Sequence, residues 1–267
     1  MAPPSRGAAL VTGASSGIGA AFADALAERG HDLVLVARRG EPLGKRATVL
    51  KDAHGVAVEV FPADLATAAG MRAVEARLDL GGIGMLVNNA GVGDIAAFLD
   101  ADREAHARMI AVNITALTRL SHAACSAMLR QGGGTMINVA SGFAFDLMPG
   151  AAVYAASKAY VFQLTQVLAA ELSGQGIAFQ CLVPGLTRTN LGGAEESGLF
   201  DLFPPEMIQS PRAVAEASLA GLALGELVCI PKLEDYAAFE QAHAAMRAIG
   251  REPGHNRVAA RYGVDLT

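Results

Sequence analysis

Several features are scarce in this sequence of 267 residues, and each scarcity excludes a class of protein. Only three cysteines occur, and they are scattered and lack C-x-x-C spacing, at Cys125, Cys181 and Cys229. This argues against a disulfide framework or a zinc site and suits a reducing compartment. The six histidines show no metal-ligand spacing either, so we expect no bound metal.

Long apolar runs and long basic runs are also missing. No apolar run reaches the roughly 18 residues that a membrane span needs, and the opening MAPPSRG does not resemble a signal peptide. A net charge of −5 without basic tracts argues against a nucleic-acid partner. A lipid-surface enzyme would need an amphipathic basic helix at 235–249, where acidic and basic charges are instead mixed. We expect a cytoplasmic protein with neither a membrane nor a nucleic-acid partner.

Apolar sequence is abundant and ordered. Hydrophobic residues make up 52% of the chain and charged residues 18%, enough to bury a large core. Short, mostly continuous apolar runs, typical of parallel strands covered on both faces, lie at 8–12, 32–37, 56–61, 84–88, 135–140, 177–183 and 226–230. Helix-patterned segments lie between them, at 17–30, 41–54, 67–79, 100–131, 151–173 and 211–224.

This alternation predicts an α/β fold, a doubly wound parallel sheet of seven strands with helices on both faces. We expect a single domain over 1–267, with a substrate lid at about 187–209 and a C-terminal extension at about 232–267. The stretch 187–209 is rich in glycine and contains the pair Pro204–Pro205. Long loops of this kind are usually lids or binding loops.

The first strand runs into a glycine-rich loop, TGASSGIG at 12–19, followed at once by a helix. Unpaired N–H groups and the helix dipole bind phosphate at such a junction. The spacing is G-x-x-x-G-x-G, and no G-K-[ST] follows, so an ATP-binding P-loop is disfavoured. The alternative is that the glycines only pack the helix on the strand. We predict that the dinucleotide is bound by Gly13, Ser15, Ser16, Gly17, Ile18 and Gly19.

The end of the second strand predicts which dinucleotide binds. This position usually selects for the ribose, and here it reads VARRG, with Arg38 and Arg39 and no carboxylate. A carboxylate would accept the ribose hydroxyls of NAD, whereas arginine suits the 2′-phosphate of NADP. A solvated loop is the alternative role for these arginines. We predict NADP(H) rather than NAD(H).

From about residue 8 to 231 the chain resembles the short-chain dehydrogenase/reductase family, whose ordinary members have a Rossmann-like fold. The resemblance rests on ordered motifs: TGASSGIG (12–19), Asp64-Leu65, NNAG (88–91), Asn113, Ser141, YAASK (154–158) and PGLTRT (184–189). It implies an oxidoreductase acting on carbonyl or secondary alcohol groups. The features VARRGEP and Leu227–Pro231 are similar to those of a broad-specificity branch.

The resemblance also implies how the cofactor is held. Asp64 and Leu65 would hold the adenine, and the backbone of Asn89 and Ala90, with Gly91 completing the motif, would line the ribose. The carboxamide of the nicotinamide would be oriented by Pro184, Gly185, Thr187 and Thr189. An aliphatic residue is frequent where Thr187 stands, so which threonine makes the contact stays open. Ser16 occupies a place where NADP-binding members often have a basic residue, so phosphate recognition would depend on Arg38 and Arg39.

Tyr154 and Lys158 are the candidate catalytic pair. Positions i and i+4 are neighbours on a helix, so their polar ends meet. A phenol has a pKa near ~10, and a nearby ammonium together with the positive ring of the oxidised cofactor would lower it. Tyr154 would then act as general acid in reduction and general base in oxidation, while Lys158 also holds the nicotinamide ribose. The alternative is an interfacial edge with a snorkelling lysine.

Ser141 and Asn113 complete the predicted catalytic set. Ser141 follows the fifth strand, at the edge where open α/β sheets bind ligands, and would hydrogen-bond the substrate oxygen. By resemblance, Asn113 would tie a water chain to Lys158. Either residue could instead cap or bond its own backbone.

Substrate and assembly are less constrained by the sequence. Apolar residues after Thr189, with the loops 143–149 and 94–99, favour a small hydrophobic ketone or alcohol of acyl, aromatic or steroid-like kind. These side chains could equally anchor the loop to the body. Glu195, Glu196 and Asp201 argue against a strongly anionic substrate. The helix at 151–173 is apolar on more than one face, which predicts a homodimer or homotetramer. A catalytically silent nucleotide sensor or scaffold of the same fold is the alternative function.

Overall fold

The computed structural model describes residues 7–193, 198–250 and 258–264. It divides into two compact units, Met1–Pro231 and Lys232–Thr267. The expected lid and C-terminal extension therefore each contain a stretch outside the described residues, and Glu195 and Glu196 lie in the first of these.

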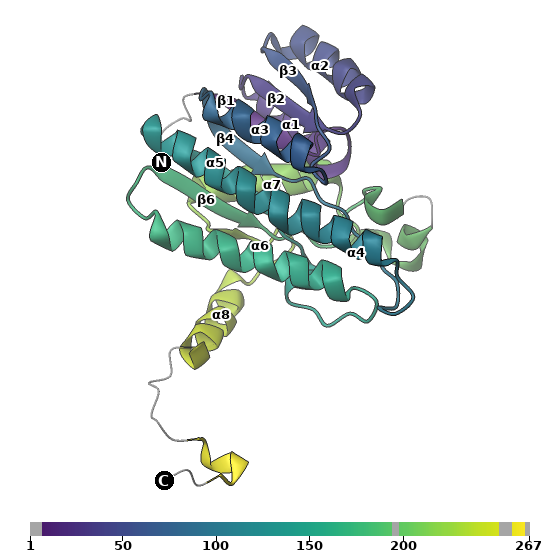
Figure 1. Ribbon diagram of the computed structural model, residues 1–267, viewed down its shortest axis with the longest axis vertical. Coiled ribbons are helices and arrows are strands. Elements are labelled where there is room, and N and C mark those ends of the chain that lie inside the picture. The colour runs from purple at the N-terminus through teal and green to yellow at the C-terminus, as the bar shows by residue number, and fades with distance from the viewer. Residues whose placement is uncertain (1–6, 194–197, 251–257, 265–267) are drawn as a thin grey trace. The chain divides into compact units, whose positions relative to one another are not determined.

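A parallel sheet of seven strands forms the centre of the first unit, in the order β3-β2-β1-β4-β5-β6-β7 (Figure 1). The strands are β1 (Ala8–Thr12), β2 (Leu33–Ala37), β3 (Val58–Pro62), β4 (Ile83–Asn88), β5 (Gly134–Val139), β6 (Ile177–Leu182) and β7 (Val228–Cys229). The predicted sheet is thus confirmed. The last strand is shorter than expected at both ends. Before it, the Glu226 N–H still bonds back to the Gly221 carbonyl oxygen of α7 at 2.9 Å, and Pro231, two residues beyond it, lacks the N–H that a longer ladder needs.

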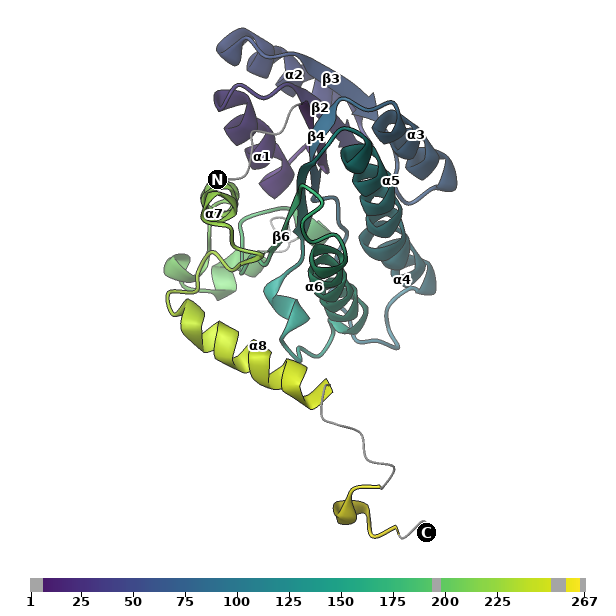
Figure 2. The ribbon, with the colours of Figure 1, turned by 90° about the vertical axis from the view of Figure 1, so that its left-hand side faces the viewer.

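Helices cover both faces of the sheet, as predicted (Figure 2). On one face lie α1 (Gly17–Glu28), α2 (Gly40–His54) and α7 (Pro211–Leu224). On the other lie α3 (Ala68–Asp79), α4 (Arg103–Ile110), α5 (Leu117–Arg130) and α6 (Ala152–Glu171). Each face has its own apolar core, centred on Phe22 and Leu26 on the first and on Leu120 and Met128 on the second.

The helix expected at 100–131 differs from the prediction in two ways. It begins only at Arg103, because the Asp102 carboxylate caps it by accepting from the Glu104 N–H at 3.1 Å. It is also interrupted by a π-helical turn, η1 (Ala111–Ala116), between α4 and α5. Such wide turns occur often at functional sites, and this one contains Asn113.

The second unit contains α8 (Tyr236–Gly250) and a short 3₁₀ turn, η6 (Ala260–Tyr262). Three rings follow one another along α8: Tyr236 lies 5.6 Å from Phe239, which stacks on His243 at 5.4 Å. None of the helices in the described ranges is both long and apolar enough to cross a bilayer.

The strand order reverses between β1 and β4, which are direct neighbours. In an open α/β sheet, the crevice beyond the carboxyl ends of two such strands is where ligands bind. The loops after β1 and β4 are the glycine-rich loop and the NNAG motif, so the fold brings the two sequence motifs together.

Candidate active site

Hydrogen bonds fasten the loop after β1 to the loop after β4. The Thr12 hydroxyl oxygen accepts from the N–H groups of Asn89 and Ala90, at 3.0 and 2.9 Å. In return, the Asn89 side-chain amide donates to the Thr12 carbonyl oxygen at 2.9 Å. Sequence reasoning assigned Thr12 no role, although it is the first residue of the glycine motif. The Asn89 side chain therefore helps to hold the two loops together, and the Asn89 backbone lies beside the glycine loop.

The glycines of the loop are required by space and by backbone conformation. Gly13 and Gly17 have φ values of +68° and +56°, which L side chains rarely adopt. A Cβ at Gly19 would overlap the Asn89 amide nitrogen and the Gly13 carbonyl oxygen. A Cβ at Gly17 would lie 3.0 Å from the Thr189 methyl carbon, so the strand-end segment after β6 also reaches this loop.

The start of α1 fits a bound phosphate. Among the described residues, the N-cap Ser16 makes no side-chain cap, and the first turn carries no acidic residue. The N–H groups of Gly17, Ile18 and Gly19 have no acceptor within the helix, because the first intrahelical bond runs from Ala20 to the Ser16 carbonyl. These unpaired donors and the closely approached glycine backbone suit the pyrophosphate of a dinucleotide.

Two guanidinium groups follow β2. Arg38 and Arg39 are both exposed, and within the described ranges neither forms an ion pair or a side-chain hydrogen bond. Arg38 lies close enough to Asp64, after β3, to lower the pKa of that carboxyl. The predicted ribose selector and the predicted adenine contact are therefore neighbours, and the buried Leu65 follows directly.

The segment after β6 packs against both the glycine loop and the loop after β5. The Pro184 carbonyl oxygen accepts from the Gly142 N–H at 3.0 Å. The Thr187 hydroxyl donates to the Gly185 carbonyl oxygen at 3.0 Å, while Thr189 contacts Gly17. An isolated parallel β-bridge between Thr187 and Gln209 joins the two ends of the expected lid.

Tyr154 and Lys158 lie one turn apart on α6, and both are buried. The Lys158 ammonium donates to the Val139 carbonyl oxygen at 2.9 Å and lies 5.7 Å from the centre of the Tyr154 ring. A Cβ on Gly91 would lie 3.5 Å from the Lys158 nitrogen. The lysine therefore faces the end of β5 and the NNAG motif rather than solvent, which disfavours the snorkelling alternative.

Ser141 is the N-cap of a short 3₁₀ turn, η2 (Gly142–Ala144), directly after β5. Its hydroxyl oxygen accepts from the Phe143 N–H at 3.3 Å, so it does cap its own backbone. It also lies within hydrogen-bonding reach of the Tyr154 phenol, whose pKa it lowers. The cap on its own backbone therefore leaves this serine next to the phenol, and its role toward a substrate oxygen stays a prediction.

Burial dominates the protonation of the pair. Burial raises the pKa of the Tyr154 phenol, and the hydrogen bond with Ser141 only partly offsets this. Burial lowers the pKa of Lys158 to about 8, with the nearby Cys181 acting in the opposite direction. The expected lowering of the phenol pKa is not produced by the described protein groups alone. The phenol keeps its proton, which is the state that a general acid needs.

Asn113 connects the π turn to two other parts of the site. Its side chain exchanges hydrogen bonds with the Val92 backbone, accepting from the N–H and donating to the carbonyl, both at 2.9 Å. It also donates to the Ser157 hydroxyl at 3.0 Å, and that hydroxyl donates to the Tyr154 carbonyl oxygen at 2.7 Å. Sequence reasoning assigned Ser157 no catalytic or binding role, although it lies inside the YAASK motif. It is the link through which Asn113 holds α6.

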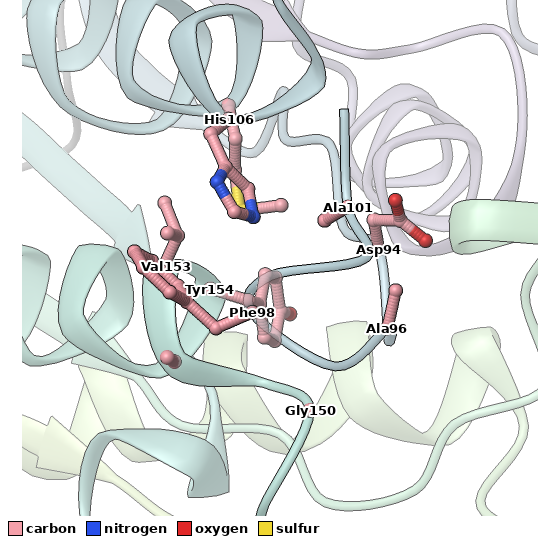
Figure 3. Close-up of a pocket in the computed structure, with 10 residues that line it drawn as sticks. Asp94, Ala96, Phe98, Ala101, His106, Gly150, Val153 and Tyr154 are labelled. Carbon is pink, nitrogen blue, oxygen red and sulfur yellow. The ribbon is translucent and has the colours of Figure 1, made fainter. Parts of the chain in front are cut away.

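A small cavity of about 10 Å³, room for one water molecule, lies beside Tyr154 (Figure 3). Asp94, Ala96 and Phe98 line it from the loop expected at 94–99, and His106 enters from α4, stacked on Phe98 at 5.3 Å. Nothing in the sequence marks His106 as part of the site, because its position depends on how α4 packs.

Apolar groups from three segments surround Tyr154. Phe143 meets its ring edge-on at 5.6 Å, and a Cβ on Gly93 would lie 3.3 Å from both the Tyr154 ring and the Leu191 side chain. Leu191, in the expected lid, thus packs against the loop that contains Gly93, beside Tyr154.

Comparison with known proteins identifies the chain. The sequence profile of the short chain dehydrogenase family matches residues 7–198. The chain belongs to this short-chain dehydrogenase/reductase family. As an oxidoreductase of this family, it acts on alcohol or carbonyl groups.

Particular relatives span most of this short-chain dehydrogenase. A D-threitol dehydrogenase from Mycolicibacterium smegmatis is 33% identical over 218 residues, covering 79% of this chain and 84% of the relative. A short-chain dehydrogenase from Sphingobium yanoikuyae, solved in complex with NADPH, has a TM-score of 0.90 and 38% identity, covering 96% of this chain and 100% of its own. A bulky-bulky ketone specific alcohol dehydrogenase from Comamonas testosteroni has a TM-score of 0.88 and 34% identity, covering 97% and 99%.

Across the described part of this dehydrogenase, no group of three or more metal-binding side chains occurs, and the three cysteines are free and buried.

Proposed function

We propose that this chain transfers hydride between NADP(H) and the carbonyl or secondary alcohol carbon of a bulky, hydrophobic substrate. The observation that carries the proposal is the placement of Tyr154. Its buried phenol is flanked by Ser141 and Lys158, at the same sheet edge as an uncapped helix N-terminus behind a glycine loop.

The proposed chemistry divides between cofactor and protein. When bound, the cofactor supplies or takes up the hydride. Tyr154 gives its proton to the substrate oxygen during reduction and removes it during oxidation. The Ser141 hydroxyl hydrogen-bonds the same oxygen and stabilises the charge that develops on it. Lys158 holds the nicotinamide ribose, and its ammonium favours the phenolate left after proton transfer.

Asn113 is proposed to act through other residues. It fixes the Val92 backbone and, through Ser157, the first turn of α6. The Val92 backbone follows the NNAG motif, which Lys158 faces, and the first turn of α6 carries Tyr154. Asn113 therefore positions Lys158 and Tyr154 relative to each other.

NADP(H) preference is supported by Arg38 and Arg39, which are exposed at the ribose-selecting position. The similar Sphingobium enzyme was solved with NADPH. The test is Arg38→Asp, with dissociation constants measured for NADPH and NADH. We expect the NADPH/NADH affinity ratio to fall at least ~10-fold, because a charge-assisted pair is lost and a repulsion is added. An unchanged ratio contradicts the assignment.

A bulky hydrophobic substrate is supported by the apolar groups around Tyr154, namely Phe98, Phe143 and Leu191. The Comamonas enzyme, named for bulky-bulky ketones, matches 97% of this chain, so the match takes in most of residues 232–267. The D-threitol dehydrogenase is named for a small polyol, which an apolar lining suits poorly.

The experiment is NADPH consumption by the purified protein with ketones of graded size. We expect ketones with two large substituents to give the highest kcat/KM, above small ketones and above ketose sugars. Tight NADPH binding without turnover across the series would point to a silent sensor instead.

A homodimer or homotetramer is also proposed. Apart from Glu171, the last residue of α6, the residues of this helix that face solvent recur at helical spacing and carry no charge: Ala152, Ala156, Tyr160, Gln163, Val167 and Ala170. An uncharged stripe on a helix already packed on the sheet fits burial against a second copy. Light scattering at micromolar concentration tests this, and a monomer contradicts it.

A further inference from the structure

The Asp64 carboxylate, after β3, is held by an ion pair from another element. Arg108, on α4, donates from one guanidinium nitrogen to both carboxylate oxygens, each at 3.2 Å. The Ala66 N–H donates to the same group at 3.0 Å. Arg108 matches none of the family motifs, and nothing in the sequence pairs it with Asp64, 44 residues away.

Two opposite effects act on the pKa of this carboxylate. Partial burial pushes the pKa of Asp64 up, but the Ala66 and Arg108 hydrogen bonds and the charges of Arg108 and Arg38 outweigh it and lower the pKa. Asp64 is therefore ionised at neutral pH. It is close enough to Arg38 for their charges to interact, so an unpaired Asp64 would attract Arg38 and repel any phosphate bound there.

We propose that Arg108 is a residue determining cofactor specificity: by pairing with Asp64, it leaves Arg38 available for the 2′-phosphate of NADP(H). This inference rests on the proposed NADP(H) preference. The pair is only half-exposed, with 40% and 35% of the two side chains accessible, so solvent screens it incompletely. Removing Arg108 takes away one positive charge and exposes a negative one at the adenosine end.

A purely structural role for Arg108, tying α4 to the loop after β3, predicts something different. Loss of such a tie would lower stability and weaken both cofactors equally. Arg119→Met is the matched control, because Arg119 makes a similar pair with Glu75 between α5 and α3, with 44% of its side chain accessible. This control removes the same charge and one surface ion pair away from the adenosine end.

The experiment measures dissociation constants of NADPH and NADH by the fluorescence of the reduced cofactor, at low salt and at about 0.5 M salt. At low salt, Arg108→Met is expected to lower the NADPH/NADH affinity ratio about five- to tenfold, and less at high salt. Arg108→Lys, which keeps the charge, should stay within about twofold of the original ratio, as should Arg119→Met.

The decisive arm is rescue by a second change. Asp64→Asn in the Arg108→Met background removes the unpaired negative charge and is expected to restore most of the ratio. Absence of rescue, or an equal loss for both cofactors, overturns the inference. If Arg38→Asp lowers the ratio and Arg108→Met does not, the inference alone fails. If Arg38→Asp also has no effect, the proposed NADP(H) preference itself is wrong.

Discussion

The two halves of the site are built differently. On the proposed cofactor side, hydrogen bonds between the side chains of Thr12 and Asn89 and backbone groups hold the loops after β1 and β4 together. On the proposed substrate side, contacts are mainly between side chains: Phe98 with His106, Phe143 with Tyr154, and Leu191 over Gly93. A hydrogen-bonded backbone gives one fixed shape, whereas packed side chains can be exchanged. The first half suits a cofactor that stays the same, and the second suits a substrate that varies between relatives.

Tyr154 lies where the two halves meet, and we expect its substitution to have the largest effect on activity. Tyr154→Phe keeps the ring that packs on Phe143 but removes the proton donor. We expect ketone reduction to fall about 10³-fold, within the usual range for losing a general acid, with NADPH affinity nearly unchanged. Steady-state kinetics and fluorescence titration measure the two effects. A kcat within about tenfold of the original would contradict the acid role.

Gly19→Ala tests the rigidity of the cofactor half. The added methyl would overlap the Asn89 amide and the Gly13 carbonyl oxygen, so the junction of the two loops must shift. We expect NADPH affinity to fall roughly 5- to 150-fold, since overpacking typically costs about 1–3 kcal/mol.

Gly44→Ala is the control for that change. Gly44 lies inside α2, and a Cβ added there would meet nothing within 4 Å. The substitution should leave NADPH binding unchanged and raise the free energy of unfolding by roughly 0.5–1 kcal/mol. Equal effects of the two alanines on NADPH affinity would disprove the fixed junction.

Lys158→Met tests whether the buried Lys158 ammonium lowers the free energy of unfolding. Burial lowers the folded-state pKa of Lys158 to about 8 from an ordinary 10.5, so the folded state disfavours the ammonium. Between these values the unfolded chain binds more protons, and stability of the original protein rises with pH. Lys158→Met should therefore raise the free energy of unfolding, by up to roughly 3 kcal/mol at pH 7, while abolishing turnover.

The pH dependence distinguishes this effect from altered packing. The gain from Lys158→Met should shrink as pH rises from about 8 towards 10.5, because the lysine of the original protein becomes neutral. Thermal unfolding at about pH 7 and about pH 9.5 measures this. A gain that does not change with pH would be a packing effect.

Leu191→Ala tests the proposed substrate side of the site. Leu191 packs over Gly93 beside Tyr154, so its truncation should raise KM for a bulky ketone by ~3- to 10-fold and leave NADPH affinity unchanged. Leu202→Ala is the control in the same segment, because Leu202 is 77% exposed. Equal effects of the two changes, or a loss of cofactor affinity, would argue against a lid contact at Leu191.

The sequence predicts the fold well because the signals for strands and helices lie within short segments. Continuous apolar runs such as AALVT mark strands buried on both faces, and their alternation with helices leaves few possible sheets. The proximity of the candidate side chains was predictable for a similar reason: Tyr154 and Lys158 are one turn apart, and Ser141 lies two residues past the end of a strand.

What the sequence could not reveal depends on distant partners. The hydrogen bonds between Thr12 and Asn89 join two separate elements, and so does the ion pair between Arg108 and Asp64. The π turn at 111–116 reads AVNITA, without the Gly or Pro that marks an interruption, so the segment 100–131 looks like one helix in the sequence. The sequence predicts a lowered phenol pKa because the neighbouring charge is visible in it, whereas the extent of burial is not.

The π turn also determines what a one-residue deletion in this helix would change. A turn of this kind accommodates one residue more than a regular α-helix does, without breaking the helix on either side. Because the wide turn rotates by less per residue than the roughly 100° of an α-helix, α4 and α5 keep their orientation relative to each other. Deleting one residue there, for example Thr115, would therefore let α4 and α5 join as one regular helix with nearly the same faces. The change would be confined to the turn itself, and with it to the position from which the Asn113 side chain bonds Val92 and Ser157.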